Sequence, residues 1–261
     1  MGVHFVDTWG AAKAACARLR EAPSDGSGAG GRVLAFDMEG APLGTHTSLL
    51  QLAFSPYEIY VFDVITLGQS LFDASHLLPI LTDPKILKLC YDCRGDAGAL
   101  FHQHRVRAYG FYDLQIVYAS LFPTQHSNGF LRGLHRALEC TLAPQDACAF
   151  TERKMALKQR WRMNKEDLSL RQRPLLPETV TYAAADVAHL FDMFRQWSPF
   201  FTQRSVVATS TLRMLNSLAA FSSPQKKAHI DFVLLRPLRP YFVVVRKPPP
   251  TDQKAEEPMV I

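Results

Sequence analysis

Long apolar runs are what this sequence lacks most plainly. No stretch of its 261 residues approaches the roughly 18 continuous apolar residues of a membrane-spanning helix. The N-terminus has no charged and then apolar signal pattern, and Val6 stands where a myristoylation pattern after Gly2 requires serine or threonine. We therefore expect an intracellular protein of the cytoplasm or nucleus that does not contact a membrane. A mitochondrial location stays open, because a presequence already removed would leave no trace.

Cysteine is scarce and has no regular spacing. The chain has five cysteines, an odd number that does not suit a disulfide framework. Cys90 and Cys93 form one CxxC pair, but a structural zinc site needs a second pair of ligands, and Cys140 and Cys148 do not supply one at suitable spacing. We therefore expect buried, reduced thiols in a reducing compartment.

A strong charge of either sign is also missing. Lysine and arginine number 29 against 24 acidic residues, which gives a net charge of +5 and a sequence pI of about 9.0. This mild excess is compatible with a polyanionic partner and equally with an ordinary solvated surface. The length suits one large α/β domain, or one domain plus an appendage.

Short β-prone runs and helical patterns follow one another along the chain. Their order predicts an α/β fold in which a mixed sheet is flanked by helices, although the order of the strands cannot be read from it. The expected strands are residues 3–6, 33–39, 48–54, 58–64 and 86–91. The expected helices run from Asp7 or Thr8 to Arg20, over 74–81, 96–103, 113–121 and 129–139, and from Pro177 to about 197.

The C-terminal part has a different character. Residues 1–197 are expected to form the main domain, followed by a basic extension over 198–247 and a disordered tail over 248–261 that begins with three prolines. Two β-prone runs in the extension, 230–235 and 241–245, suggest a small hairpin. Such a hairpin is too short to be stable alone, so we expect it to pack on the main domain, or on a second copy or another protein.

Two acids mark the end of the first long strand. Asp37 and Glu39 are two positions apart, so a strand projects both carboxylates from the same face. Their repulsion would be relieved if cations lay between them. The simpler alternative is that the strand ends here and reaches solvent.

Two further motifs provide acids that could converge with this pair. Tyr182 and Asp186 are four residues apart, so a helix places them on one face, and the three alanines between them allow a close approach to the sheet. Asp96 opens a helix directly after a strand, and Asp92, nearer the strand end, competes with it for the same role. Four converging carboxylates would balance two divalent cations of the Mg²⁺ type, which prefer oxygen ligands. Two such ions about 4 Å apart can clamp a phosphoryl displacement.

Taken in order, these motifs resemble the DEDDy 3′–5′ exonucleases of the DnaQ-like superfamily, which include RNase D and the Werner-type exonuclease domain. Residues 173–175 and 182–187 are similar to RNase D. Residues 37–40, 51–53 and 91–94 resemble the Egalitarian and piRNA-biogenesis branch of exonuclease-domain proteins. The resemblance covers about residues 3–197.

The resemblance implies a ribonuclease-H-like fold and a two-metal mechanism. In that mechanism Mg²⁺ or Mn²⁺ would be held by Asp37, Glu39, Asp96 and Asp186, with Tyr182 orienting the attacking water. RNA or single-stranded nucleic acid would be trimmed from a free 3′ end to nucleoside 5′-monophosphates. Some members of the second branch have lost their carboxylates and act as RNA-binding adaptors, so an adaptor role is the alternative. The additional helical domains of RNase D proteins have no counterpart of sufficient length here.

Candidate nucleic-acid contacts lie outside these motifs. Lys154, Lys158 and Arg162 recur at every fourth residue, so a helix would align them in a basic stripe. A plain solvated helix face explains the same pattern.

Three further residues are candidates for nucleic-acid binding. By the resemblance, Leu49 and Gln51 lie where related enzymes cover the terminal base, and Arg94 follows the strand that leads to Asp96. His189 is expected to be structural, because Tyr182 already fills the position that other branches give to a histidine.

Overall fold

The strands of the molecule form a single mixed sheet. The computed structural model describes residues 2–21, 32–40, 46–123, 131–163 and 168–219. The strand order is β1-β4-β3-β2-β5-β6, with β3 antiparallel to β2 and β4 and the other neighbouring pairs parallel. The predicted mixed α/β sheet is therefore confirmed, as is the hairpin of β3 and β4. The strands are β1 (Gly2–Val6), β2 (Arg32–Glu39), β3 (Leu49–Ser55), β4 (Glu58–Asp63), β5 (Ile86–Cys90) and β6 (Phe111–Asp113).

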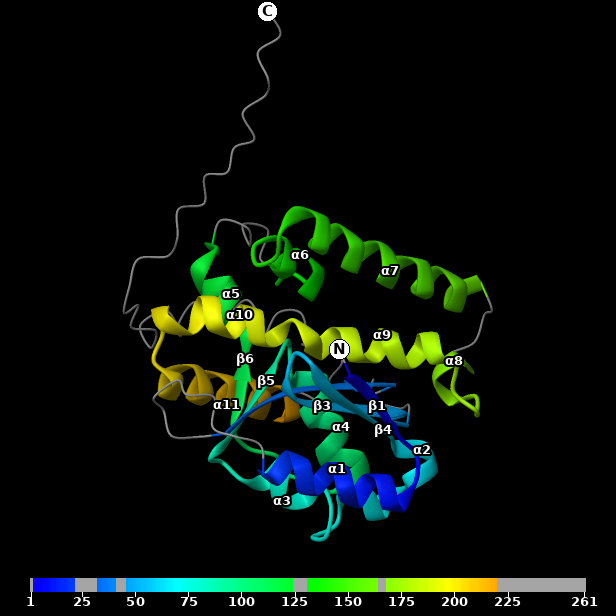
Figure 1. The fold of residues 1–261 in the computed structure, drawn as a ribbon. Helices are drawn as coiled ribbons and strands as arrows, with labels where there is room; N and C mark the ends of the chain where they lie inside the picture. Colours follow the sequence, from blue (N-terminus) through cyan, green and yellow to red (C-terminus); the bar gives the residue numbers. More distant parts are fainter. Residues whose placement is uncertain (1, 22–31, 41–45, 124–130, 164–167, 220–261) are drawn as a thin grey trace, which may run out of the picture.

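Helices cover both faces of this sheet (Figure 1). Along β2, Leu34 and Phe36 pack into a core with α1, α3 and α4, whereas Val33 and Ala35 pack into a second core with α9 and α10. The alternation of a strand thus sends Asp37 and Glu39 to the α9 face. The helices are α1 (Trp9–Glu21), α2 (Val64–Leu67), α3 (Leu78–Thr82), α4 (Arg94–His104), α5 (Leu114–Leu121), α6 (Leu134–Glu139), α7 (Pro144–Met163), α8 (Leu168–Arg171), α9 (Pro177–Ala188), α10 (Leu190–Trp197) and α11 (Gln203–Ala219), with 3-10 turns at Gln69–Phe72 and Ser198–Phe200.

Helix α9 lies directly on the sheet because its inner face is small. Ala183 and Ala184 are fully buried, and α9 packs against β2, β3 and β4, which confirms the close approach predicted from the alanines. Pro177 occupies its first turn, where a missing backbone N–H costs nothing. The predicted continuous helix is interrupted at His189, whose backbone dihedrals of −94° and −2° separate α9 from α10.

Several boundaries differ from the sequence prediction. The three-residue strand β6 was not predicted, because a run so short has no visible period. The expected helix over 74–81 begins only at Leu78, and the one over 129–139 begins at Leu134 within the described residues. Thr8 proves to be the residue that caps α1, since its hydroxyl accepts from the N–H of Ala11 at 3.3 Å.

Helix α11, like α7, is an element that the sequence pattern did not predict. It packs on β6, α4 and α5 and contributes Val206 and Met214 to the two cores. Its Arg213 is 4% exposed and donates to Asp113 Oδ2 at 2.5 Å. The runs 230–235 and 241–245 and the tail 248–261 lie outside the described residues, so the predicted division after residue 197 stays a prediction.

The cysteine thiols divide into buried and accessible ones. Cys16, Cys90 and Cys93 are buried, as predicted, and none of the five cysteines forms a disulfide in the described part of the chain. Cys140 is half-buried, and Cys148 on α7 is exposed, so the prediction of buried thiols is wrong for Cys148. Within the described part of the chain, no helix is long and apolar enough to cross a membrane.

Candidate active site

Three carboxylates meet where the end of β2 faces α9. Oxygen atoms of Asp37, Glu39 and Asp186 all lie within 4.8 Å of one another. Strand alternation aims the first two at α9, and the close packing of α9 brings the third to them. The donors are all carboxylate oxygens, so the cluster fits a hard divalent cation such as Mg²⁺ or Mn²⁺.

Three carboxylates close together in a buried space repel one another, so ionisation of all three is unfavourable without a cation. Burial raises the pKa of Asp37 well above its usual value, and the charges of Asp96 and Asp186 raise it further, against the lowering effect of Lys154. Burial raises the pKa of Glu39 in the same way, followed by the charges of Asp186 and Asp37. A bound cation would relieve this repulsion and favour the ionised forms.

Asp96 lies in the first turn of α4 with 9% exposure. It is not one of the three carboxylates that meet within 4.8 Å and is not among the residues that line the cleft, but its charge interacts with those of Glu39 and Asp186. Burial raises its pKa well above the usual value, and the charges of Asp92 and Glu39 add to that rise. Asp92 is already paired, because Arg94 donates to its two carboxylate oxygens at 2.6 and 2.7 Å and Arg213 lies 3.4 Å away. This pairing leaves Asp96 as the better candidate for the fourth metal ligand.

The three clustered carboxylates line a cleft with a volume of about 340 Å³, and Tyr182 lines the same cleft. Burial raises the pKa of its phenol far above the usual value, and the charges of Glu39 and Asp186 contribute. The phenol therefore stays protonated at neutral pH and can orient a water by a hydrogen bond. The cleft is lined by Phe36, Asp37, Met38, Glu39, Tyr91, Asp92, Gln115, Gly133, Leu134, Lys154, Tyr182, Asp186 and Leu190.

Lys154 enters this cleft from α7. Its ammonium group forms an ion pair with Asp186 and lies 4.0 Å from the ring centroid of Tyr182. The residue therefore faces the acid cluster, where the predicted basic stripe would have turned it toward solvent. The side chains of Lys158 and Arg162 lie outside the described residues, so the rest of the stripe stays a prediction.

Two of the three other residues predicted to contact nucleic acid are buried in the structure. Leu49 and Gln51 both have 0% exposure, and Leu49 packs in the core on the α9 side. Gln51 lies opposite Asp37 in the strand register, and its amide has no hydrogen-bond partner among the described residues. Arg94 is held by Asp92. Contact of these three residues with nucleic acid stays a prediction, which the burial of Leu49 and Gln51 does not favour.

A buried polar network behind the cleft was missed by the sequence reasoning. Asp113 accepts from the backbone N–H of Asp92 at 2.9 Å and from Arg213, and Arg213 also donates to Gln115 at 2.5 Å. Asp92 adopts a left-handed φ of 66°, which this network and Arg94 hold in place. Arg213 and Asp113 are 100 residues apart in the chain, so no local pattern could have revealed their contact.

The loop before α9 is fixed by the Arg173 side chain. It forms two hydrogen bonds with Asp63, at 2.5 and 2.6 Å. Burial opposes ionisation of Asp63, but the hydrogen bonds from Arg173 and Thr66 outweigh it and hold the pKa of Asp63 below its usual value. The Arg173-Pro174-Leu175 motif therefore anchors the start of α9 to the end of β4.

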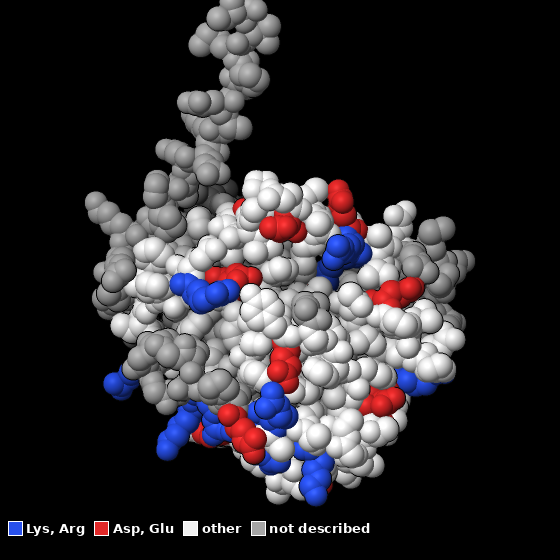
Figure 2. Space-filling view, in the orientation of Figure 1, with Lys and Arg blue, Asp and Glu red and all other residues white. Residues whose placement is uncertain are grey.

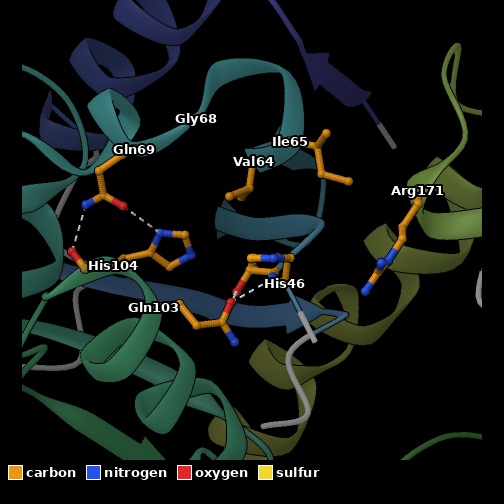
Figure 3. A pocket seen from close by; sticks show the side chains of 9 residues that line it. His46, Val64, Ile65, Gly68, Gln69, Gln103, His104 and Arg171 are labelled. Carbon is orange, nitrogen blue, oxygen red and sulfur yellow. Dashed lines mark hydrogen bonds between the residues drawn. The ribbon is translucent and has the colours of Figure 1, made fainter. Parts of the chain in front are cut away.

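A second cavity of about 460 Å³ lies near the same end of the sheet (Figure 3). Gln103 accepts hydrogen bonds from the backbone and hydroxyl of Thr47, while the His104 ring bonds Gln69 at 3.0 Å. Burial and then His46 lower the pKa of His104 to about 4, so it is neutral at pH 7. In Figure 3, the Arg171 side chain extends from α8 toward His46 and supplies positive charge.

The charged surface is patchy on the face seen in Figure 2. Lysine and arginine side chains gather mainly along the lower edge, where α1 and α3 lie in Figure 1, with acidic residues among them. The described lysine and arginine side chains thus do not form one broad basic band on this face.

Comparison with known proteins agrees with this geometry. A family model described as 3′–5′ exonuclease matches residues 3–199. The piRNA biogenesis protein EXD1 of Mus musculus is 35% identical over 101 residues, which is 38% of this chain and 17% of that protein. EXD1 of Xenopus laevis is 32% identical over 109 residues, or 41% of this chain and 24% of that protein. The matches thus span less than a quarter of these relatives.

Solved structures share the fold at low sequence identity. Trypanosoma brucei RNase D in complex with GMP superimposes with a TM-score of 0.65 and 22% identity, over 83% of this chain and 64% of that one. Escherichia coli RNase D gives a TM-score of 0.52 and 18% identity, over 92% of this chain and 51% of that one. On the family match and this likeness of fold, the chain belongs to the 3′–5′ exonuclease family and has an RNase D-like fold.

Proposed function

We propose that the chain is a divalent-metal-dependent 3′–5′ exonuclease that hydrolyses RNA or single-stranded nucleic acid to nucleoside 5′-monophosphates. The convergence of Asp37, Glu39 and Asp186 within 4.8 Å, in a chain of this family, carries the proposal. Asp96 is proposed as the fourth acid. Oxygen donors in this number suit two Mg²⁺ or Mn²⁺ ions.

Each side chain has a separate task in this proposal. The four acids would hold two divalent ions, which when bound supply the activated water and stabilise the leaving 3′ oxygen. Tyr182 donates a hydrogen bond that orients the water, because its raised pKa keeps the phenol protonated.

RNA is the substrate class that the comparisons favour. Trypanosoma brucei RNase D, which shares this fold, has been solved in complex with RNA U12. The cleft of about 340 Å³ has the size of a small-ligand pocket and could take a single terminal nucleotide. An unpaired 3′ end is therefore the proposed substrate.

A labelled-oligonucleotide assay tests this proposal. Full-length protein would be incubated with Mn²⁺ and 5′-labelled RNA or DNA carrying either a free or a blocked 3′ end, with Asp186→Asn as control. We expect a ladder of shortened RNA only from the free 3′ end and only with wild-type protein. Intact oligonucleotide after incubation with folded, metal-saturated protein would contradict the enzymatic proposal.

An RNA-binding adaptor is the second candidate function. The ion pair of Lys154 with Asp186 favours it, because the lysine occupies one of the carboxylates that a metal would need. Metal titration separates the two functions. Two divalent sites in wild-type protein support the enzyme, whereas RNA binding without any divalent site supports the adaptor.

Residues 198–247 are proposed to add an interface for a second copy or another protein and to extend the basic surface. Light scattering of the full chain tests self-association: a monomer at micromolar concentration would exclude the homodimer.

A further inference from the structure

We propose that Lys154 is a built-in cation that competes with a divalent ion for Asp186, so that helix α7 sets the metal affinity of the site. This inference rests on the proposed metal-dependent function and adds a means of regulating it. Metal binding and the Lys154–Asp186 ion pair then exclude each other.

The position of Lys154 is fixed by contacts on two sides. Its ammonium pairs with Asp186, and it lies 4.0 Å from the ring centroid of Tyr182 and 5.6 Å from that of Phe150. Its side chain is only 15% exposed and that of Asp186 11%, so water screens the pair weakly. The two partners of the ammonium on α9 are thus residues assigned to catalysis.

The charge of the cluster explains why the lysine lies there. Without a metal, the repulsion among Asp37, Glu39 and Asp186 is partly relieved by Lys154, whose charge lowers the pKa of both Asp37 and Glu39. Two divalent ions would balance four ionised carboxylates without any help, and the ammonium would then be surplus. A divalent ion at the Asp186 carboxylate would strongly repel the ammonium that pairs with its Oδ2, and this repulsion would displace the lysine.

Displacement is mechanically simple because a lysine has a flexible four-carbon stem. Helix α7 lies alongside α9 on the side away from the sheet (Figure 1) and packs against it. Any ligand that shifts α7 would therefore change how firmly Lys154 holds Asp186. Metal affinity is in this way coupled to the position of a helix outside the acid cluster.

Manganese binding to the full-length protein tests the competition directly. Mn²⁺ affinity would be measured by calorimetry, without nucleic acid, for wild type, Lys154→Met and Arg153→Met. Methionine keeps the apolar stem against Tyr182 and Phe150 but removes the charge. Arg153 is the matched control, because it is exposed on the same helix and its loss changes the net charge equally.

A gain of affinity is the expected result. Lys154→Met should bind Mn²⁺ about tenfold more tightly than wild type, as removal of a close competing charge pair implies. Arg153→Met should stay within about twofold, because exposed charges are screened. Equal or weaker binding by Lys154→Met would overturn the inference.

The outcomes also separate this inference from the proposed function. If wild type and Lys154→Met bind Mn²⁺ equally, the competition is wrong while a metal-dependent enzyme stands. If neither protein binds Mn²⁺, both ideas fail. If Lys154→Met binds more tightly but metal-loaded wild type leaves RNA intact, the competition stands and the enzymatic function fails.

Chemical labelling gives a second measurement on unaltered protein. Reductive methylation followed by mass spectrometry reports how accessible each lysine is. We expect Mn²⁺ to raise the labelling rate of Lys154 severalfold and to leave that of the exposed Lys85 unchanged. Lys154 labelling that does not respond to saturating Mn²⁺ would contradict displacement.

Discussion

At the residue scale, Asp186 and Tyr182 divide the proposed chemistry between metal binding and water positioning. Asp186→Asn should weaken Mn²⁺ binding and lower kcat/KM by about a thousandfold or more, since a metal contributes several kcal/mol to the transition state. Tyr182→Phe should lower kcat by about a hundredfold or less and leave Mn²⁺ affinity nearly unchanged. Calorimetry and single-turnover cleavage check both values. Loss of metal binding in Tyr182→Phe would show that the phenol has a different role.

The choice between Asp92 and Asp96 can be decided by a pair of amide variants. Asp92 is occupied by Arg94 and Arg213, whereas Asp96 senses the acid cluster. Asp96→Asn should therefore abolish RNA trimming, and Asp92→Asn should retain measurable trimming with reduced thermal stability. Asparagine tolerates the left-handed φ of position 92, so the comparison is not confused by backbone strain. An inactive Asp92→Asn beside an active Asp96→Asn would reverse the assignment.

Lys88 should make the folding stability depend on pH, independently of the acid cluster. It has 0% exposure, its ammonium donates to the carbonyl of Asp83 at 2.7 Å, and burial lowers its pKa to about 7. The folded chain therefore binds fewer protons than the unfolded chain between pH 7 and the usual lysine pKa of about 10.4, so folding stability rises with pH there.

Replacement of Lys88 should remove this dependence. Relative to Lys88→Met, wild type should gain about 2 kcal/mol in its free energy of unfolding between roughly pH 7 and 9. Urea unfolding at the two pH values measures it, with the exposed Lys85→Met as control. Parallel pH dependence in wild type and Lys88→Met would mean that Lys88 is not titrating in this range.

At the element scale, α11 belongs physically to the core although it follows the residues matched by the family. Its Arg213 compensates the buried charge of Asp113, and its Ser210 hydroxyl accepts from the Asp113 N–H at 3.0 Å. Removal of such a buried partner typically costs about 3–5 kcal/mol. The site therefore depends on a helix that lies beyond its own sequence motifs.

Two truncations test this dependence. A chain that ends at Ala219 should keep its melting temperature within a few degrees, because α11 and its contacts remain. A chain that ends at Trp197 should lose cooperative unfolding or aggregate, because β6 and α4 lose their cover. Circular dichroism melting curves of both chains give the comparison. A stable, active chain that ends at Trp197 would show that α11 is dispensable.

The sequence predicted some elements well and others poorly, for identifiable reasons. The placement of Asp37 and Glu39 on a strand, and of Tyr182 and Asp186 on a helix, follows from local periodicity alone. Strand β6 is too short to show a period. No element was predicted for the residues of α11, which precede the two β-prone runs of the extension. The inward direction of Lys154 is set by how α7 packs on α9, which spacing along one helix cannot reveal.

At the scale of the whole molecule, sequence order indicated the fold class, while tertiary contacts decided which residues meet. The mixed sheet flanked by helices was predicted, but its strand order was not. Leu49 and Gln51 were assigned to substrate from the resemblance, and the structure buries both completely. The exposure of a strand residue depends on which elements pack against that face of the sheet. A sequence motif shared with relatives does not contain this information.

The distribution of basic residues predicts how RNA affinity responds to salt. Six of the basic residues assigned to the C-terminal extension follow residue 219: Lys226, Lys227, Arg236, Arg239, Arg246 and Lys247. If they bind phosphates, removal of each such residue should make the log–log salt slope shallower by about 0.7. RNA binding measured by fluorescence anisotropy in Ca²⁺ should thus show a slope shallower by at least about one unit for the chain that ends at Ala219. Identical slopes would assign RNA binding to residues 1–219 alone.

The uneven burial of the thiols has a practical consequence. Cys148 is exposed on α7, whereas Cys16, Cys90 and Cys93 are shielded, so a maleimide fluorophore will react with Cys148 before those three. The hydrogen bond from Cys148 to Glu152 raises the pKa of the Cys148 thiol, so mildly alkaline buffer will speed attachment of the fluorophore. The dye would lie fewer than two helical turns from Lys154. The natural sequence thus offers an optical reporter for motions of α7 without the introduction of a new cysteine.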